Sequence, residues 1–256
     1  MISAPLSAPL AVNGLHHQRG TFTLGPINLT LETGQCVALA GGNGAGKSTL
    51  LRCLAGLLAP DKGSATVFGS AASGLRSRRK LAFLPERFSP PHYLTGREFL
   101  DYYLSLCGVR QMPSGELFRT LCLDPAVLGQ PVRKLSKGTA QKLGLAAILA
   151  TGRPLLLMDE PFSGLDPEAR QGLRSAMTAF AQQGGCLLFS THVFEAMDDL
   201  VARLVILHSG GIRFDGSVSA CRSQAGQESL ELAFLQHIQA SPVEEIVNNS
   251  GTMSKK

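Results

Sequence analysis

Long apolar runs are what this sequence most clearly lacks. Its longest ones, such as residues 155–158 and 186–189, are strand-length, whereas a helix that crosses a bilayer needs about 18 or more mostly apolar residues. Residues 1–10 alternate small side chains with prolines, without the charged start and continuous apolar segment of a secretion signal. We therefore expect no membrane-spanning segment in this chain and a location inside the cell.

Closely paired cysteines are also missing. The six cysteines are scattered without Cys-X-X-Cys spacing, so neither a zinc site nor a disulfide framework is indicated. No internal repeat is visible. With 256 residues and 44% hydrophobic content, the chain is long enough to bury a substantial core, and one large domain is expected.

The order of the elements predicted near the N-terminus is strand, glycine loop, helix. Residues 27–31 alternate as an edge-type strand, and residues 36–40 form a short apolar strand before a glycine cluster. A helix is predicted from Ser48 to Leu58, because its leucines recur at three- and four-residue spacing and Pro60 stops it.

The rest of the chain continues this α/β pattern with one interruption. The runs at 155–158 and 186–189 are typical of parallel strands that are buried on both faces. Residues 90–132 instead read as mostly helical, which indicates an inserted helical subdomain. A helix is predicted at 229–238, and the polar tail at 241–256 is predicted to be disordered.

A phosphate-binding loop is the clearest chemical motif. Residues 41–49 satisfy the pattern Gly-X-X-X-X-Gly-Lys-Ser/Thr between a predicted strand and helix. Such a loop turns its backbone N–H groups toward phosphates, while Lys47 neutralises the β- and γ-phosphates and Ser48 coordinates Mg²⁺. The predicted ATP-binding residues here are Gly41, Gly42, Asn43, Gly44, Ala45, Gly46, Lys47, Ser48 and Thr49.

Two carboxylates directly follow the strand at 155–158. Asp159 and Glu160 are expected at the carboxyl end of that strand, where open α/β sheets bind ligands. Adjacent residues on a strand point to opposite sides. The interpretation is that Asp159 serves the metal, whereas Glu160 polarises the water that attacks the γ-phosphate.

Three further motifs resemble those of one family of P-loop proteins. Residues 135–141, Leu-Ser-Lys-Gly-Thr-Ala-Gln, resemble the LSGGQ signature of ABC ATPases. Residues 163–166 are similar to the D-loop of that family, and residues 190–192 to the strand end that carries its switch histidine. The five motifs follow one another in order between Gly41 and His192.

The resemblance implies a P-loop NTPase fold with a mostly parallel sheet, an N-terminal antiparallel β subdomain and an inserted helical subdomain. It implies one ABC ATPase domain over residues 1–240, with the helical subdomain at about 90–150. It also implies catalytic roles for Glu160 and His192.

ATP and Mg²⁺ are the cofactors that the resemblance implies. Ser136, Gly138 and Asp166 are expected to contact ATP, the first two from a second copy of the chain or a homologous subunit. Ser48, Asp159 and Glu86 are the expected metal ligands.

The sequence departs from the family pattern at two places. Glu86 stands where the family usually carries a glutamine that contacts Mg²⁺. The family also stacks adenine on an aromatic residue before the phosphate loop, and the aligned stretch at 16–19 has none, so His17 and Phe22 are both candidates. Weak base selectivity, with GTP also accepted, is the hypothesis that follows.

The function implied is that of an ATP-hydrolysing subunit that drives export by separate transmembrane permease subunits. Residues 229–235 resemble the terminal helix common in bacterial exporter ATPases. The protein is then expected in the cytoplasm, peripheral on the inner face of the cell membrane, with no nucleic-acid partner. The alternative is a non-transport ABC ATPase that acts on DNA or ribosomes, a class that usually has a coiled-coil insertion or tandem cassettes.

Overall fold

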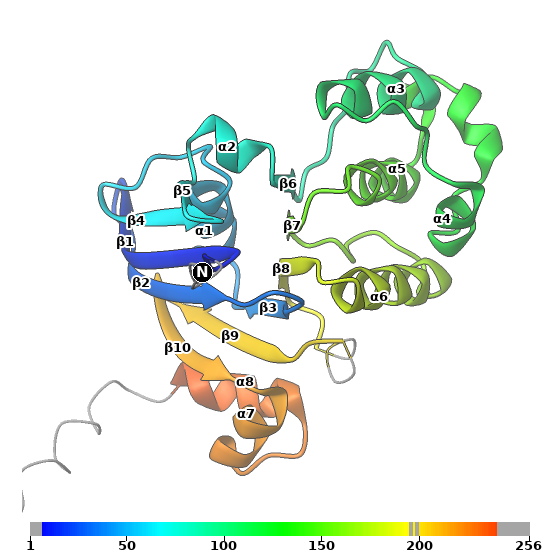
Figure 1. Ribbon diagram of the computed structural model, residues 1–256. Helices are drawn as coiled ribbons and strands as arrows, with labels where there is room; N and C mark the ends of the chain where they lie inside the picture. The colour runs from blue at the N-terminus through cyan, green and yellow to red at the C-terminus, as the bar shows by residue number, and fades with distance from the viewer. Residues whose placement is uncertain (1–6, 195–196, 198–199, 240–256) are drawn as a thin grey trace, which may run out of the picture.

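The computed structural model describes residues 7–194, 197 and 200–239, which form two sheets and the helices packed on them (Figure 1). The strands are β1 (Leu10–Arg19), β2 (Phe22–Leu31), β3 (Cys36–Ala40), β4 (Lys62–Val67), β5 (Ser70–Ala71), β6 (Leu81–Leu84), β7 (Leu155–Met158), β8 (Cys186–Thr191), β9 (Arg203–His208) and β10 (Gly211–Gly216). The helices are α1 (Lys47–Leu54), α2 (Leu75–Arg78), α3 (Gly96–Leu106), α4 (Gly115–Thr120), α5 (Lys137–Leu149), α6 (Pro167–Gln182), α7 (Val218–Ala225) and α8 (Leu230–Gln239), with two 3₁₀ turns, η1 (Pro125–Gly129) and η2 (Val132–Lys134).

The larger sheet has the strand order β10-β9-β3-β8-β7-β6. All of its neighbouring strands pair in parallel except β10, which is antiparallel to β9. The predictions of a mostly parallel sheet and of strands at 36–40 and 155–158 are confirmed. The carboxyl ends of β3, β6, β7 and β8 lie at one edge of the sheet, where ligands of open α/β sheets bind.

The smaller sheet is antiparallel, with the order β2-β1-β4-β5. This is the N-terminal β subdomain that the resemblance implied. The strand expected at 27–31 lies in its edge strand β2, which begins earlier than predicted because its first residues pair with the end of β1.

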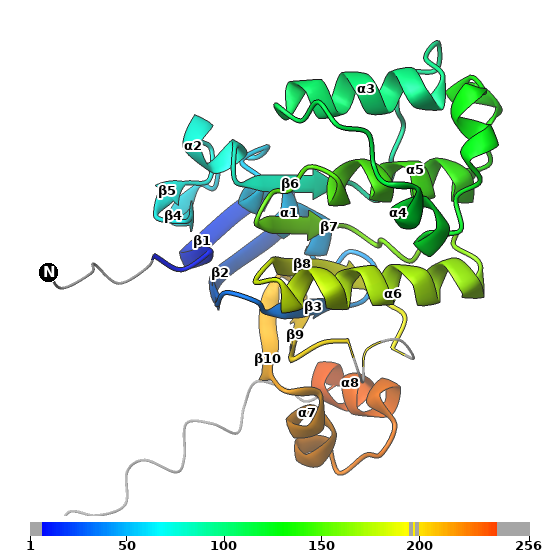
Figure 2. The same ribbon diagram turned by 45° about the vertical axis from the view of Figure 1, so that its right-hand side comes forward.

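The two faces of the larger sheet are buried in two separate cores. Val37 and Leu39 of β3 pack with α1 and the smaller sheet, whereas Ala38 and Ala40 pack with α5 and α6. This alternation follows from the strand period of two. Figure 2 shows α6 in front of the larger sheet and the smaller sheet behind it. The result is a layered α/β structure that holds the larger sheet between two cores.

Helix α1 is shorter than predicted. It ends at Leu54 rather than at Leu58. Gly56 has φ +68°, and its N–H donates to the carbonyl of Cys53 while the N–H of Leu57 donates to the carbonyl of Arg52. This pair of bonds is a Schellman cap, which stops a helix at a glycine before any proline is reached.

The insertion between β6 and β7 is helical and contains α3, α4, η1, η2 and α5 (Figure 1). Helix α3 starts at Gly96, because Thr95 accepts a hydrogen bond from the N–H of Glu98 and donates its own N–H to the Glu98 carboxylate. This reciprocal capping box satisfies two N–H groups at the helix start. We refer to the elements α3 to α5 as the helical lobe.

The helix predicted near the C-terminus is present and follows a pair of strands. Strands β9 and β10 form a hairpin, and α8 begins one residue after the predicted helix start at 229. The tail predicted to be disordered, 241–256, lies outside the described residues. Within the described part of the chain, no helix is both long and apolar enough to cross a membrane.

Candidate functional site

The glycine loop joins β3 to α1 in the conformation that its motif predicts. Gly44 and Gly46 have φ +78° and +108°, a region that side chains with a Cβ rarely adopt. Gly41 lies so close to the larger sheet that a Cβ there would be 2.5 Å from the Leu207 carbonyl oxygen. The loop therefore requires glycine at these positions for both conformation and space.

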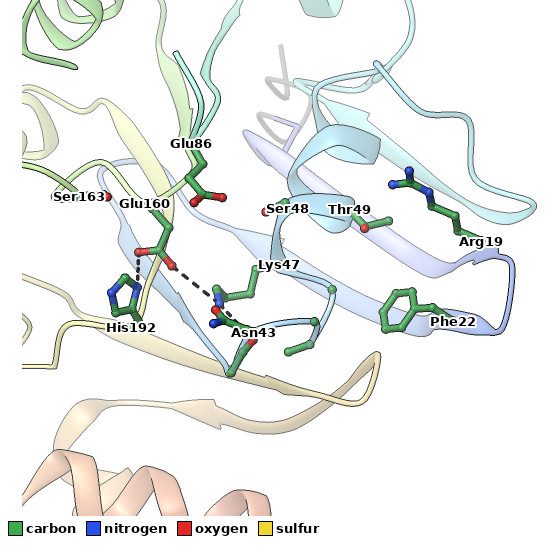
Figure 3. A pocket seen from close by; sticks show the side chains of 14 residues that line it. Arg19, Phe22, Asn43, Lys47, Ser48, Thr49, Glu86, Glu160, Ser163 and His192 are labelled. Atoms are coloured by element: carbon green, nitrogen blue, oxygen red, sulfur yellow. Dashed lines mark hydrogen bonds and ion pairs between the residues drawn. The ribbon is translucent and has the colours of Figure 1, made fainter. Parts of the chain in front are cut away.

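A cavity of about 450 Å³ opens beside this loop (Figure 3). The residues that line it are Arg19, Phe22, Gly42, Asn43, Gly44, Ala45, Gly46, Lys47, Ser48, Thr49, Glu86, Glu160, Ser163 and His192. Its volume is in the range of small-molecule and cofactor sites. Residues from the loop, from the segment after β6 and from the ends of β7 and β8 thus share one cavity.

Lys47 is held at the base of the cavity. Its Nζ donates to the carbonyl oxygens of Gly41 at 2.6 Å and Gly42 at 3.3 Å, and it lies 3.8 Å from Glu160 Oε1. Only 8% of the residue is exposed. A largely buried ammonium in a region of low dielectric interacts more strongly with an anion than an ammonium in water does, so Lys47 is suited to contact a phosphate.

Glu160 connects this ammonium to His192. Its second carboxylate oxygen, Oε2, lies 2.8 Å from His192 Nδ1 (Figure 3). The imidazole is 63% exposed, whereas the Glu160 side chain is 11% exposed. The three side chains form a continuous chain of charged and ionisable groups along one wall of the cavity.

The side chains of Asp159 and Glu160, which follow β7, point in different directions, but strand alternation is not the reason. They were expected to alternate along a strand, but β7 ends at Met158 and Glu160 has φ +51°. That left-handed backbone costs about 1–3 kcal/mol for a residue with a Cβ and persists only where neighbouring contacts enforce it. A turn rather than strand alternation therefore aims Glu160 into the cavity.

Ser190 supports this turn, and sequence reasoning did not identify its role. The N–H of Glu160 donates to Ser190 Oγ at 2.8 Å, and Ser190 Oγ donates to Asp159 Oδ1 at 2.6 Å. Asp159 is only 1% exposed and is not among the residues that line the cavity. The serine at the end of β8 thus joins both carboxylates to the neighbouring strand.

Within one chain, the lining of this cavity does not include Ser136, Gly138 or Asp166. Ser136 is exposed and caps α5 by accepting a hydrogen bond from the Thr139 N–H. Asp166 caps α6 and lies 2.7 Å from Lys142 Nζ. The hydrogen bond from Lys142, together with that from the cap, lowers the pKa of Asp166.

Only one of the two candidates for the nucleobase contact lies at the cavity. Phe22 lines the cavity, and its ring lies so close to the loop that a Cβ on Gly46 would be 2.9 Å from its Cζ. His17 does not line it and lies 3.5 Å from the Asp61 carboxylate instead. Arg19, which sequence reasoning missed, also lines the cavity because it shares the β1–β2 turn with Phe22.

The oxygen donors near the loop suit Mg²⁺. Ser48 and Glu86 both line the cavity, and Asp159 lies in the turn that follows β7. Hydroxyl and carboxylate oxygens are the ligands of this hard cation, which usually keeps several waters and binds through substrate phosphates. Among the described residues, no group of three or more His, Cys, Asp or Glu side chains could hold a metal ion. The residues present fit an ion that arrives with a phosphate ligand.

The strand, glycine loop, helix and acidic strand end define a P-loop nucleotide-binding protein. The family model described as ABC transporter matches residues 24–163. The lantibiotic transport ATP-binding protein SrtF of Streptococcus pyogenes is 30% identical over 90% of this chain and 97% of its own length. The chain belongs to the ABC transporter family.

Other relatives are longer than this chain. An uncharacterized ABC transporter ATP-binding protein of Synechocystis is 30% identical over 77% of this chain but only 57% of its own length. A solved ATP-binding subunit of an ABC transporter superposes with a TM-score of 0.82 at 30% identity, and covers 89% of this chain and 98% of that one. The match in fold thus extends over most of the chain.

Proposed function

We propose that this chain binds ATP with Mg²⁺, hydrolyses it, and serves as the ATP-binding subunit of a transporter whose membrane-spanning subunits are separate chains. The observation that carries the proposal is the continuous contact from Lys47 through Glu160 to His192 in one cavity. These are the groups that phosphoryl transfer to water requires: a cation for the phosphates and a base for the water.

In the proposed reaction, Lys47 exchanges its loop carbonyl partners for β- and γ-phosphate oxygens. Mg²⁺, when it is bound with the nucleotide, neutralises negative charge on the phosphates. Glu160 accepts the proton of the attacking water, and His192 orients that water and the γ-phosphate. The left-handed turn at Glu160 and its bond to Ser190 keep the base in place before substrate arrives.

The second half of the site is proposed to come from another copy of the chain or a homologous subunit. Ser136, which is exposed, and Gly138, which is half-buried, lie at the start of α5, outside the cavity of their own chain. A helix N-terminus attracts anions through its free N–H groups and its dipole. Two copies that face each other would place this helix start of one against the γ-phosphate held by the other.

Membrane subunits are proposed to dock beside Glu86 on the helical lobe. On α3, Tyr102 and Leu106 are 55% and 67% exposed, and Tyr93, just before this helix, is 83% exposed. Exposed aromatic and large apolar side chains are typical of interaction surfaces. We propose export as the direction of transport, at the cytoplasmic face of the cell membrane, because the terminal helix resembles that of exporter ATPases. The SrtF relative, named for lantibiotic transport, is consistent with this role.

The hydrolysis proposal is tested with Glu160→Gln. Glutamine keeps the size of the side chain but cannot accept the proton of water, so kcat should fall by at least about a hundredfold while ATP affinity stays within a few fold. Glu116→Gln, an exposed carboxylate on α4, is the matched control and should keep full activity. Unchanged turnover in Glu160→Gln would remove the assigned role.

The pairing proposal is tested on the same variant by analytical ultracentrifugation. Glu160→Gln with ATP and Mg²⁺ should sediment as a dimer, and with ADP as a monomer. Replacing the exposed Ser136 by Glu should abolish the dimer, because the new carboxylate would face the γ-phosphate. A monomer under all conditions, including with the membrane subunits present, contradicts the composite site.

The transport proposal is tested by copurification from membranes. A protein with several membrane-spanning helices should copurify with the tagged chain. Reconstitution of the two proteins together should change the ATPase rate. Copurification with ribosomes or DNA-processing proteins would instead support the non-transport alternative.

A further inference from the structure

The segment that carries His192 is fixed on one side by β8. Thr191, the last residue of β8, is 1% exposed, and its Oγ1 accepts a hydrogen bond from the Val193 N–H at 2.9 Å. This small turn orients the peptide groups on both sides of His192. The imidazole itself is 63% exposed, so its position depends on its 2.8 Å contact with Glu160 and on the backbone before and after it.

On the other side, Phe194 packs against the C-terminal helix. The ring centroid of Phe194, two residues after His192, lies 4.8 Å from that of Phe234 on α8, with the planes inclined by 43°. Aromatic pairs at this distance contribute about 0.5–1.5 kcal/mol beyond the area they bury. Phe234 is 7% exposed, and Met197 is buried in the same core.

Helix α8 is itself held against the larger sheet. The His237 ring lies 4.8 Å from the Phe214 ring of β10, and His237 Nε2 lies 3.3 Å from the Cys221 carbonyl oxygen of α7. Figure 1 shows α7 and α8 stacked beneath β9 and β10, away from the helical lobe. These contacts hold the helix that carries Phe234 against the rest of the protein.

We propose that Phe234, acting through Phe194, is a positioning residue for His192. The inference rests on the proposed ATPase function and adds a requirement to it: the C-terminal helix pair holds the downstream end of the histidine segment while β8 holds the upstream end. Without the Phe234 ring, Phe194 loses its partner, and the exposed imidazole departs from its 2.8 Å contact with Glu160. Nucleotide binding should change little, because Phe194 and Phe234 do not line the cavity.

The test compares Phe234→Ala with Leu235→Ala, the next residue on α8, which is 39% exposed. A displacement of about 1 Å in a reacting group can cost up to about a hundredfold in rate, so Phe234→Ala should lower kcat about tenfold and leave KM within about twofold. Leu235→Ala should leave both unchanged. Phe234→Leu fills most of the lost volume and keeps the assay informative if the alanine variant unfolds.

Two further measurements distinguish positioning from general loosening of the fold. Phe194→Ala should lower kcat as Phe234→Ala does, and the double variant should be no worse than either one, because both changes break the same contact. In histidine-labelled protein, the His192 resonance, assigned by its loss in His192→Ala, should shift in Phe234→Ala and stay in place in Leu235→Ala.

The outcomes separate this inference from the function on which it rests. A wild-type protein without ATPase activity contradicts the proposed function. An active wild type with an unchanged kcat in Phe234→Ala and Phe234→Leu overturns the positioning role, and so does a lower kcat with an unmoved His192 resonance, since Phe234 would then act elsewhere.

Discussion

Replacing Ser190 by Ala should damage both stability and turnover. Ser190 has no exposed surface, and its single hydroxyl holds the Glu160 N–H and the Asp159 carboxylate at the same time. Alanine removes both hydrogen bonds and offers no replacement. A buried N–H and a buried carboxylate oxygen are then left without this partner, at the base of the candidate catalytic site.

The magnitude follows from the two lost bonds. Each buried polar group left unsatisfied costs about 1–3 kcal/mol, and a charged one more. The free energy of unfolding should therefore fall by about 2–6 kcal/mol for the two groups. At about 2–4 °C per kcal/mol for a chain of this size, Tm should fall by about 4–24 °C. Because the strained turn at Glu160 loses one of its supports, kcat should also fall at least about tenfold.

Denaturant unfolding and steady-state ATPase assays measure the two effects. The matched control is Ser175→Ala, whose hydroxyl is exposed on α6 and donates to the Gln171 carbonyl at 3.2 Å. A surface change of this kind should alter stability by no more than about 0.5 kcal/mol. If Ser190→Ala were as stable as Ser175→Ala and equally active, the argument that Ser190 supports the catalytic turn would be refuted.

Three more predictions concern the loop and the thiols. Lys47→Ala should weaken ATP binding at least about tenfold in calorimetry, because it removes a charge-assisted contact from a buried site; unchanged affinity would contradict the phosphate-loop assignment. Gly46→Ala should also lose ATP affinity and be destabilised by about 1–2 kcal/mol or more, since φ +108° is unfavourable for alanine, and a fully active, stable variant would argue against the loop conformation. Burial raises the pKa of Cys36 to about 12 and those of Cys53 and Cys221 to about 11. At pH 8 these thiols should therefore stay protonated in the folded protein and react with iodoacetamide only after denaturation, which mass spectrometry of the labelled peptides checks.

Much of the site could be predicted from the sequence because its chemistry lies in short contiguous motifs. The loop at 41–49 carries its glycines, lysine and hydroxyl groups in one continuous segment, so its conformation is determined locally. Asp159 and Glu160 follow a four-residue apolar strand, and that boundary places them at a sheet edge. Where local signals competed, prediction was weaker: the Gly56 cap ends α1 before the proline that was expected to stop it.

Only the tertiary structure decided which of these groups meet and what holds them. Parallel strands bring their carboxyl ends to one edge, and so unite Lys47, Glu160 and His192 from segments far apart in the chain. No local sequence pattern predicts the hydrogen bond between Ser190 and the Glu160 turn or the packing of Phe234 on Phe194. Such contacts depend on distance in space rather than on spacing along the chain, so residue type alone determined the chemistry, whereas the packing of distant segments determined its geometry.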